Sequence, residues 1–510
     1  MKVVKFFGLA LVLACVCTAL SFAQSITSGD IAGVVTDPTG AVVPNAQVTA
    51  TSDSTGATHT TNSNGEGLYR FSFLQPGTYT LGVKAGGFQP GSHKIQVSVG
   101  QTANGNIALA VTAATTTIEV TGTATQIDNA DLSTNFSQEQ ISLVPNPGND
   151  MSAVAQTSPG IVMNTQGGFG NFSSFGLPGT SNLFTLDGQN DNDPFLNLNN
   201  SGATNLLLGA NEVQEATVTS NGYSGQYGQL AGAQVNYVTK SGGNQFHGNA
   251  SYFWNGRVLN ADSFLNKEAG LKKNFDNVNQ WAASFGGPIV KDKTFFFWDY
   301  EGLRVVLPTS QKALIPSLPF ETATIANLNA TGQSASVPFY NTIFNLYNSA
   351  KGAAGAVPAQ DCSAFPGIPV VGPCTLSFRS TAGNFTHEYL MALRIDHKFS
   401  DNDNIFGRVQ TDRGVQATNT DPINPLFNVQ SNQPEYQGQL GWTHILNPNM
   451  VNEFKMSGAW YSAIFVNANL AATLAAFPTT ILLNDGSLSD MGGIDFVFPQ
   501  GRNVTQYQGV

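Results

Sequence analysis

Hydrophobic and polar residues alternate with a period of two along much of the second half of the chain. Residues 389–399 place three apolar side chains on one face and three charged side chains on the other. The apolar residues are Met391, Leu393 and Ile395, and the charged residues are Arg394, Asp396 and Lys398. Residues 451–461 repeat the pattern. Such alternation is typical of an amphipathic β-strand whose two faces meet different surroundings.

The alternation predicts seven strands in this half of the chain. They cover residues 246–256, 280–289, 293–305, 386–399, 404–413, 434–445 and 450–461. Three connections are tight, at residues 290–293, 400–403 and 446–449, and the connections between them are much longer. Bacterial outer-membrane barrels show this asymmetry, with short periplasmic turns and long extracellular loops. The connections therefore favour membrane-spanning strands over a soluble sandwich, with charged faces toward the lumen and apolar faces toward lipid.

Shorter strand patterns fill residues 27–112. Runs such as GVVTD (33–37) and TYTL (78–81) recur about every 8–12 residues between Gly, Pro and Asn turns, which predicts a small β-sandwich. The phrases GVVTDPTGAVVPNAQVTAT and NGEGLYRFSFLQPGTYTLGVKAGGF closely resemble a carboxypeptidase-regulatory-like domain. That resemblance implies a prealbumin-like sandwich that has an accessory role and no catalysis.

Residues 116–240 are polar and rich in glycine and asparagine, and they mix short β-like pieces with weak helical stretches. They lead directly into the first predicted barrel strand. Glycines allow tight turns inside a crowded lumen, and low charge limits the burial of unpaired ions. We therefore predict that this region is a plug.

Three phrases strengthen this interpretation. YSGQYGQLAGAQVNYVTKSGGNQFHG (223–248) resembles the plug-to-barrel junction of TonB-dependent receptors of the Oar-like subgroup. SNLFTLDGQNDND (181–193) resembles a plug motif of that group, and QWAASFGGPIVKDKTFFFWDYEGLR (280–304) resembles its second and third barrel strands. With the N-terminal sandwich, the resemblance covers nearly the whole chain after its first 23 residues.

The resemblance implies a mainly β fold: an N-terminal prealbumin-like β-sandwich, a mixed α/β plug, and a partial antiparallel outer-membrane β-barrel. The expected segments are 27–112, 116–240 and 246–510. The implied function is that of an outer-membrane transporter or receptor that moves an unidentified ligand through a plugged barrel, with TonB supplying energy and the sandwich in the periplasm. The alternative is a passive outer-membrane surface or adhesion protein without energy coupling.

Composition agrees with this assignment. Charged residues make up 11% of the 510 residues, against about 25% in an ordinary soluble domain. Mean hydropathy is only −0.07, so polar uncharged residues replace the missing charge. The net charge is −11 and no Lys/Arg cluster is present, so the chain lacks the electrostatic footprint of a nucleic-acid-binding protein.

The first 23 residues predict export. Two lysines precede a short apolar run, and small residues lead to a cleavage site between Ala23 and Gln24, as in a secretory signal peptide. A transmembrane anchor needs about 20 apolar residues, so it is disfavoured. A lipoprotein site at Cys15 is a further alternative. The export route allows disulfides, and the two later cysteines, Cys362 and Cys374, are expected to form a local one in a long extracellular loop.

One segment ahead of the plug, TTIEVTG (116–122), is a candidate TonB box by the family resemblance. Its residues Thr117, Ile118, Glu119, Val120 and Thr121 include strong β-formers. An extended peptide of this kind can add a strand to a sheet of TonB. Main-chain hydrogen bonds then transmit the force that TonB exerts on the segment. The alternative is that the segment is simply the first strand of the plug.

Other chemistry is weak. Asp187, Asp191 and Asp193 could together offer oxygen ligands to Ca²⁺, but the closing Glu of an EF-hand loop is missing, which favours a polar plug loop. The six histidines show no metal-ligand spacing, and no G-x-S-x-G or P-loop motif is present. The sequence predicts neither a cofactor nor an enzyme.

The number of strands departs from the family pattern. Plugged outer-membrane barrels have about 22 strands, and the pattern here predicts seven. The final residues, NVTQYQGV, also lack a terminal Phe or Trp. On this basis the sequence is expected to be a fragment or a truncated gene product, and assembly of the barrel from several chains is the alternative.

Overall fold

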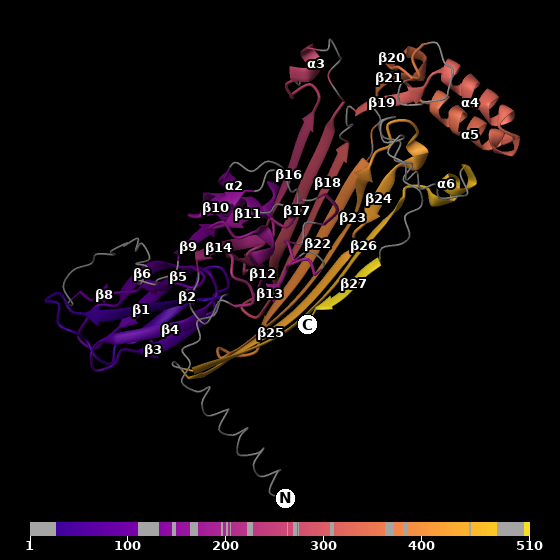
Figure 1. Ribbon diagram of the computed structural model, residues 1–510. Helices are drawn as coiled ribbons and strands as arrows, with labels where there is room; N and C mark the ends of the chain where they lie inside the picture. The colour runs from indigo at the N-terminus through magenta and orange to yellow at the C-terminus, as the bar shows by residue number, and fades with distance from the viewer. Residues whose placement is uncertain are drawn as a thin grey trace, which may run out of the picture.

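The structure is a computed structural model. It describes residues 27–110, 132–144, 149–163, 172–194, 197–199, 202–204, 206–221, 228–262, 264–268, 273, 275–306, 311–362, 372–380, 383, 385–447, 450–476 and 504–509. Figure 1 shows a small sandwich, a central region and a long sheet, with a mixed insert at the far end of that sheet. The predicted mainly β fold is confirmed.

The N-terminal sandwich is built from eight described strands. They are β1 (Gly29–Thr36), β2 (Gln47–Ser52), β3 (Thr58–Asn62), β4 (Leu68–Leu74), β5 (Gly77–Lys84), β6 (Gly91–Val97), β7 (Thr102–Asn104) and β8 (Ile107–Ala108). One sheet has the order β4-β1-β7, with β8 also on β1, and the other has the order β3-β2-β5-β6. Alternate residues such as Ile31, Val48 and Leu81 are fully buried between the sheets, so the predicted period of two builds the core.

The central region, residues 132–240, is mixed α/β. Its strands are β9 (Leu132–Ser137), β10 (Ile161–Met163), β11 (Phe172–Ser174), β12 (Leu183–Leu186), β13 (Gln189–Asn190), β14 (Val213–Asn221) and β15 (Gln234–Thr239). Five of them form a sheet in the order β13-β12-β15-β14-β9. Its helices are α2 (Gln138–Leu143) and the 3₁₀ turns η3 (Met151–Thr157), η4 (Gly179–Ser181) and η5 (Gly202–Thr204). A capping box from Ser137 and Gln140 starts α2.

The large sheet holds all seven strands predicted from the alternation. They are β16 (His247–Gly256), β17 (Asn277–Val290), β18 (Thr294–Val306), β22 (Phe385–Lys398), β23 (Asp403–Asn419), β25 (Glu435–Asn447) and β26 (Met450–Asn467). Neighbours pair antiparallel. Two short strands that the sequence did not reveal, β24 (Val429–Asn432) and β27 (Val504–Gly509), complete the described sheet. Several strands also extend beyond their predicted ends, because pairing continues past the alternating pattern.

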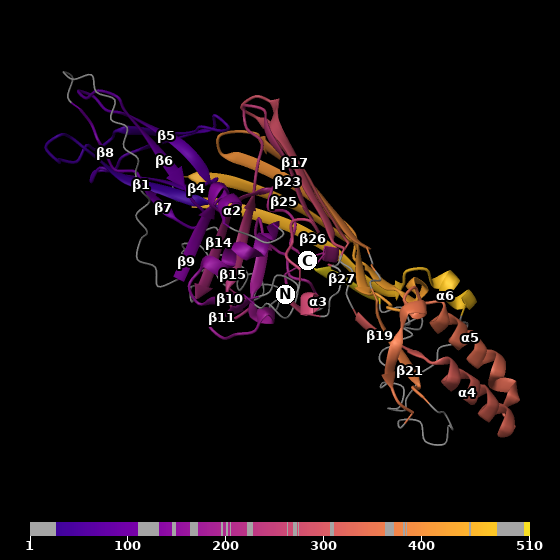
Figure 2. The same ribbon diagram turned by 90° about the horizontal axis from the view of Figure 1, so that it is seen from above.

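The two faces of the large sheet differ as predicted. On β22, Met391 and Ile395 are 43% and 42% exposed, whereas Arg394 and Asp396 are buried. The central region lies against the charged face, which we call the inward face, in both views (Figures 1 and 2). The opposite face, which we call the outward face, carries the apolar side chains.

The long connection between β18 and β22 folds into an insert at the end of the sheet opposite the tight turns (Figure 1). It contains β19 (Gln311–Pro316), α4 (Leu318–Ala330), η6 (Ser334–Ser336), α5 (Val337–Asn348), η7 (Ala353–Gly355), β20 (Val357–Gln360) and β21 (Thr375–Ser380). Its sequence predicted only a loop. The helix signal was present, since the Ser317 hydroxyl accepts the N–H of Phe320 at the start of α4 and Pro319 occupies the first turn.

The remaining short helices lie in other connections at this end: α3 (Phe264–Glu268), η8 (Pro425–Phe427) and α6 (Leu470–Ala476). Within the described residues, no helix combines the length and the apolar character needed to cross a membrane.

A disulfide joins Cys362 to Cys374, the pair expected from the sequence, with the two Cα atoms 5.0 Å apart. Cys374 is fully buried beside β21, and its backbone C=O accepts the N–H of Ser317 at 2.9 Å. The bridge therefore ties the β20–β21 end of the insert to the start of α4.

We expect reduction of this disulfide, or the Cys362→Ser substitution, to lower the stability of the insert by about 3 kcal/mol. The physical reason is that a cross-link over a separation of 12 residues removes chain entropy from the unfolded insert. Hydrogen exchange of α4 and α5, with and without reductant, measures the effect. Exchange rates that are the same in both conditions would contradict the prediction.

Candidate functional site

The strongest concentration of buried charge lies where the central region meets the inward face of the large sheet. β17, β18, β22, β23 and β25 present their polar side chains to this interface, because the period of two that places apolar groups outward places these groups inward. The polar groups from the sheet are Gln280, Asp299, Glu301, Glu388, Arg394, Asp396, Arg408, Asp412, Glu435, Gln437 and Gln439, all buried.

Arg394 on β22 is the centre of the first contact. Its Nη1 lies 3.3 Å from Asp187 Oδ2 and 2.9 Å from Thr239 Oγ1, both in the central region. Its Nη2 lies 2.9 Å from Asp396 on its own strand. The Arg394 and Asp187 side chains are only 8% and 3% exposed. This pair is therefore held away from water, where an ion pair is strong but cannot lose one partner without a large penalty.

Local structure explains why Asp187 faces Arg394. Asp187 lies in the two-residue turn between β12 and β13, with φ near 50°, and Gly188 follows it with φ near 85°. Its carboxylate accepts the Thr239 N–H at 3.0 Å and the Thr239 hydroxyl at 2.6 Å. Burial acts to raise the pKa of Asp187, but the positive charges of Arg394 and Arg408 and the Thr239 hydrogen bonds outweigh it and hold that pKa below its ordinary value. The carboxylate stays ionised.

Arg408 on β23 makes the second contact. Its Nη2 lies 2.7 Å from Oε1 of Glu212, and the two side chains are 2% and 1% exposed. Glu212 belongs to the connection before β14, close to Lys240, whose backbone N–H donates to the Glu212 carbonyl at 2.7 Å. Two arginines of the sheet thus bind two carboxylates of the central region.

Carboxylates of the sheet complete the interface from the other direction. Glu301 accepts the backbone N–H of Asn211 at 2.8 Å, and Asp299 accepts its side-chain amide at 2.5 Å. Glu388 accepts the N–H of Thr204. Because these acceptors lie on two different strands, β18 and β22, the contacts fix the central region in one position on the sheet.

The candidate cation ligands Asp187, Asp191 and Asp193 are all buried, but they turn to different partners. Asp187 pairs with Arg394, and Asp191 accepts from the Gln437 amide at 2.5 Å. Among the described residues, no three His, Cys, Asp or Glu side chains are grouped to hold a metal ion. Asp187 and Asp191 therefore supply contacts to the sheet.

Two other predicted sites cannot be placed. The candidate TonB box, residues 117–121, and the signal cleavage site at Ala23 and Gln24 lie outside the described residues. The sequence did identify Arg394 and Asp396 as lumen residues and Asp187 as part of a polar motif. It did not identify Arg408, Glu301 or Glu388 as interface residues, because only their strand parity could have indicated them, and it offered no signal for Glu212, which lies in the connection before β14.

The N-terminal sandwich contacts both the central region and the tight-turn end of the sheet. The Val99 N–H donates to Glu215 on β14 at 3.0 Å, and its carbonyl accepts the Asn135 amide at 3.1 Å. Asn244 donates its backbone N–H to Ser54 at 2.8 Å. Its side chain also bonds to Asp292 in the first tight turn. These contacts hold the sandwich at the end of the sheet where the short turns lie (Figure 1).

Glu215 is 5% exposed and has no cationic partner among the described ion pairs. Burial therefore raises the pKa of Glu215 to about 7, although the Val99 N–H opposes the shift. A carboxyl group with such a pKa changes its charge near neutral pH, at the contact between the sandwich and the central region.

Substitution Arg394→Met is expected to lower the free energy of unfolding by about 3–5 kcal/mol, because it leaves Asp187 and Asp396 buried without their cation. Denaturant titration of the chain in detergent measures this. The matched control is Lys94→Met, which breaks the surface pair with Asp53, where the lysine side chain is 62% exposed. That change is expected to stay below about 1 kcal/mol. Equal losses in the two variants would contradict the role assigned to Arg394.

The contact between Val99 and Glu215 is expected to weaken as pH rises. Glu215 keeps its proton up to about pH 7 when buried, and it ionises near its ordinary pKa of 4.5 when separation exposes it. The stabilisation is thus complete below about pH 4.5 and is lost as pH rises through about 7. Hydrogen exchange at the Val99 amide, corrected for intrinsic rates, should accelerate across this window. Glu215→Gln should remove the dependence, whereas Glu139→Gln, on the surface of α2, should not.

Comparison with known proteins places these features in a family. Residues 238–508 match the model of the outer membrane beta barrel domain, and residues 30–110 match the carboxypeptidase regulatory-like domain. The chain is 31% identical over 297 residues to the TonB-dependent transporter Oar of Myxococcus xanthus. This match covers 54% of the chain and 26% of the relative, so the chain spans about a quarter of the relative's length.

Among solved structures, the chain is similar to the outer membrane transporter YddB from Escherichia coli, with a TM-score of 0.44 and 12% identity over 66% of this chain and 40% of that one. It is also similar to a mutant of the ferric enterobactin receptor PfeA from Pseudomonas aeruginosa, with a TM-score of 0.34 and 12% identity over 66% of this chain and 46% of that one. The family-model match covers more than half of the chain and coincides with the large sheet. The chain therefore belongs to the outer membrane β-barrel family, resides in the cell outer membrane and carries an N-terminal carboxypeptidase regulatory-like domain.

Proposed function

We propose that the chain forms the sandwich, the plug and barrel strands of an energy-coupled transporter that admits an unidentified ligand through a plugged lumen. In this assignment residues 1–23 are the signal peptide, 27–112 the sandwich, 116–240 the plug and 246–510 the barrel part. The observation that carries the proposal is the pair of buried contacts Arg394–Asp187 and Arg408–Glu212, which join the central region to the inward face of the sheet.

The chemistry of this interface supports a plug that moves. An apolar contact of the same area would expose hydrophobic surface to water when it opened. Charged and amide groups instead regain hydration when they separate, which offsets part of the lost attraction. A polar interface can therefore be stable in the absence of force and still separate when an external force acts on the plug.

TonB is the proposed source of that pull, through TTIEVTG in the segment before β9. A strand added to a partner sheet is loaded along its length, so several main-chain hydrogen bonds share the force. We propose no catalytic step and no cofactor. A passive surface protein is the competing function, and it requires no binding at this segment.

The test is binding of the full chain to the periplasmic domain of TonB. Proline at position 118 or 120 removes a backbone donor from the added strand, so Ile118→Pro and Val120→Pro are expected to weaken binding by about tenfold or more. Thr125→Pro, outside the candidate box, is the matched control and should bind normally. Calorimetry measures the affinities. Absence of TonB binding by the unmodified chain, or equal binding by all variants, would favour the passive surface protein.

A further inference from the structure

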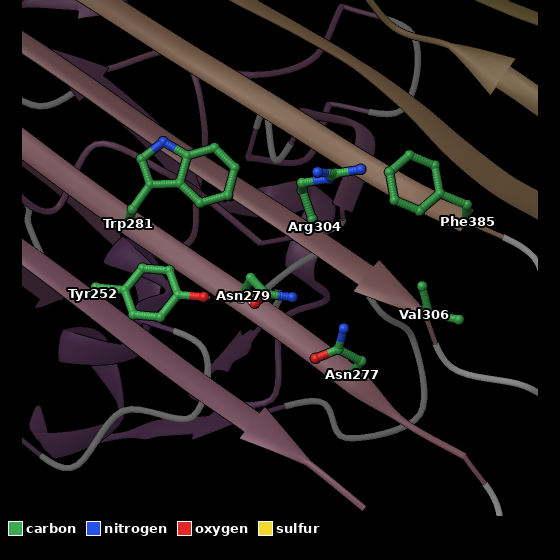
Figure 3. Close-up of a pocket in the computed structure, with 7 residues that line it drawn as sticks. All are labelled: Tyr252, Asn277, Asn279, Trp281, Arg304, Val306 and Phe385. Carbon is green, nitrogen blue, oxygen red and sulfur yellow. Dashed lines mark hydrogen bonds between the residues drawn. The ribbon is translucent and has the colours of Figure 1, made fainter.

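A groove of about 420 Å³ lies on the large sheet near the ends of β16, β17, β18 and β22, away from the tight turns (Figure 3). Figure 3 shows aromatic and amide side chains around one cation. The residues used below are Tyr252, Asn277, Asn279, Trp281, Arg304 and Phe385.

The groove opens on the outward face. Gln280, Leu303 and Glu388 lie opposite one another across three strands, and all three are buried toward the central region. Because side chains alternate along a strand, Asn279, Trp281 and Arg304 point the other way. Arg304 is exposed, and Tyr252 is 63% exposed. The groove therefore faces the membrane and is separate from the lumen.

The position of the groove along the strands, and so its depth in the membrane, follows from two of its residues. Arg304 is two residues before the end of β18, and Phe385 is the first residue of β22. Both adjoin the long insert rather than a tight turn. In outer-membrane barrels the long connections are extracellular, and aromatic side chains gather where lipid chains give way to headgroups. The groove is thus at the level of the outer-leaflet headgroups.

The groove is lined by hydrogen-bond donors, and none of its described lining residues is acidic. The Arg304 guanidinium lies 5.0 Å from the centre of the Phe385 ring. The described ion pairs do not include Arg304, and the carboxylates of β18 and β22 point inward. A cation placed at a lipid-facing position with no carboxylate beside it favours an anionic ligand.

Two amides add to this preference. The Tyr252 hydroxyl donates to Asn279 Oδ1 at 2.6 Å, and the Trp254 indole N–H donates to Asn277 Oδ1 at 2.8 Å. The aromatic donors occupy the amide oxygens and leave the side-chain NH₂ groups of both asparagines. No acceptor for either NH₂ group is found among the described hydrogen bonds, so both are able to donate to a ligand.

A second outward cation lies nearby. Arg413 on β23 sits over Tyr436, 5.0 Å from its ring centre, and donates to the Tyr436 hydroxyl. Arg304 is opposite His387 and Arg413 is opposite Tyr389, so the two arginines flank β22 and are offset by two residues. Strand spacing and rise place their Cα atoms roughly 12 Å apart. Two cations at this separation match two phosphates on one headgroup better than a single anion.

We propose that Arg304 and Arg413 bind the phosphorylated headgroup of a glycolipid in the outer leaflet. Each arginine takes one phosphate, the amides of Asn277 and Asn279 donate to sugar or phosphate oxygens, and the rings of Tyr252, Trp281 and Phe385 pack on the sugar faces and the first acyl carbons. The site is independent of the lumen, so it holds whether or not the chain transports a ligand.

The test is binding of a bisphosphorylated disaccharide lipid to the full chain in zwitterionic detergent, measured by native mass spectrometry. The bisphosphorylated form should bind about tenfold tighter than its dephosphorylated counterpart, because charge-assisted hydrogen bonds to both arginines are lost in the latter. Arg304→Gln should reduce that preference several-fold, and the Arg304→Gln/Arg413→Gln double variant should abolish it. Arg304→Lys should retain part of it, because charge remains but the planar fork does not.

Lys291→Gln, on the exposed tight turn between β17 and β18, is the matched control and should leave binding unchanged. Unchanged circular dichroism in every variant shows that the fold is kept. Equal binding of the phosphorylated and dephosphorylated lipids, or a preference that survives in the double variant, would overturn the proposal. Displacement of the lipid by an equal concentration of inorganic phosphate would also overturn it, since the site would then recognise a free anion.

Discussion

The rest of the structure depends on one constraint: charges placed on the inner side of a membrane sheet must find partners there. Arg394 and Arg408 lie on strands whose opposite face is apolar, so they cannot turn outward without exposing charge to lipid. In the central region, Asp187 pairs with Arg394 and Glu212 pairs with Arg408. Its own folding is arranged around this need, since the β12–β13 turn and the residues before β14 present those two carboxylates to the sheet. The same ion pairs therefore fix the position of the plug and determine which face of each strand points inward.

The same constraint makes the outward face informative. Apolar residues such as Met391 and Ile395 are what lipid requires, and an arginine among them calls for an explanation. Arg304 and Arg413 both lie against an aromatic ring, which shields part of the guanidinium while leaving its N–H groups at the headgroup level. Both arginines lie near the long connections, at the level of the polar headgroups. A cation on the same face at the midplane of the membrane would destabilise the sheet.

The sequence predicted those parts of the fold that depend on local pattern. All seven barrel strands were found, because alternation and tight turns act over a few residues. The short strand β24 was missed, because four residues carry too little periodicity. The alternation does not predict the α4–α5 pair, although Ser317 and Pro319 mark its start, because the pair lies inside a long connection without strand periodicity. The sequence could not predict that Arg394 pairs with Asp187, because 207 residues separate the two. The alternation of side chains shows only which face Arg394 lies on, not its partner.

The order in which the contacts break follows from their strengths. The segment that contains residues 117–121 joins the sandwich, which ends with β8, to the central region, which begins with β9. A pull on this segment therefore loads the sandwich contact and the plug contact together. The sandwich is held to the central region by two hydrogen bonds at Val99, one to Glu215 on β14 and one from Asn135 on β9, each contributing about 1 kcal/mol. The central region is held to the sheet by more contacts, namely two buried ion pairs and hydrogen bonds to Asn211 and Thr204, so more contacts must break before it moves. On the proposed function, the sandwich separates first, and its separation exposes β14 to solvent before the plug itself is displaced.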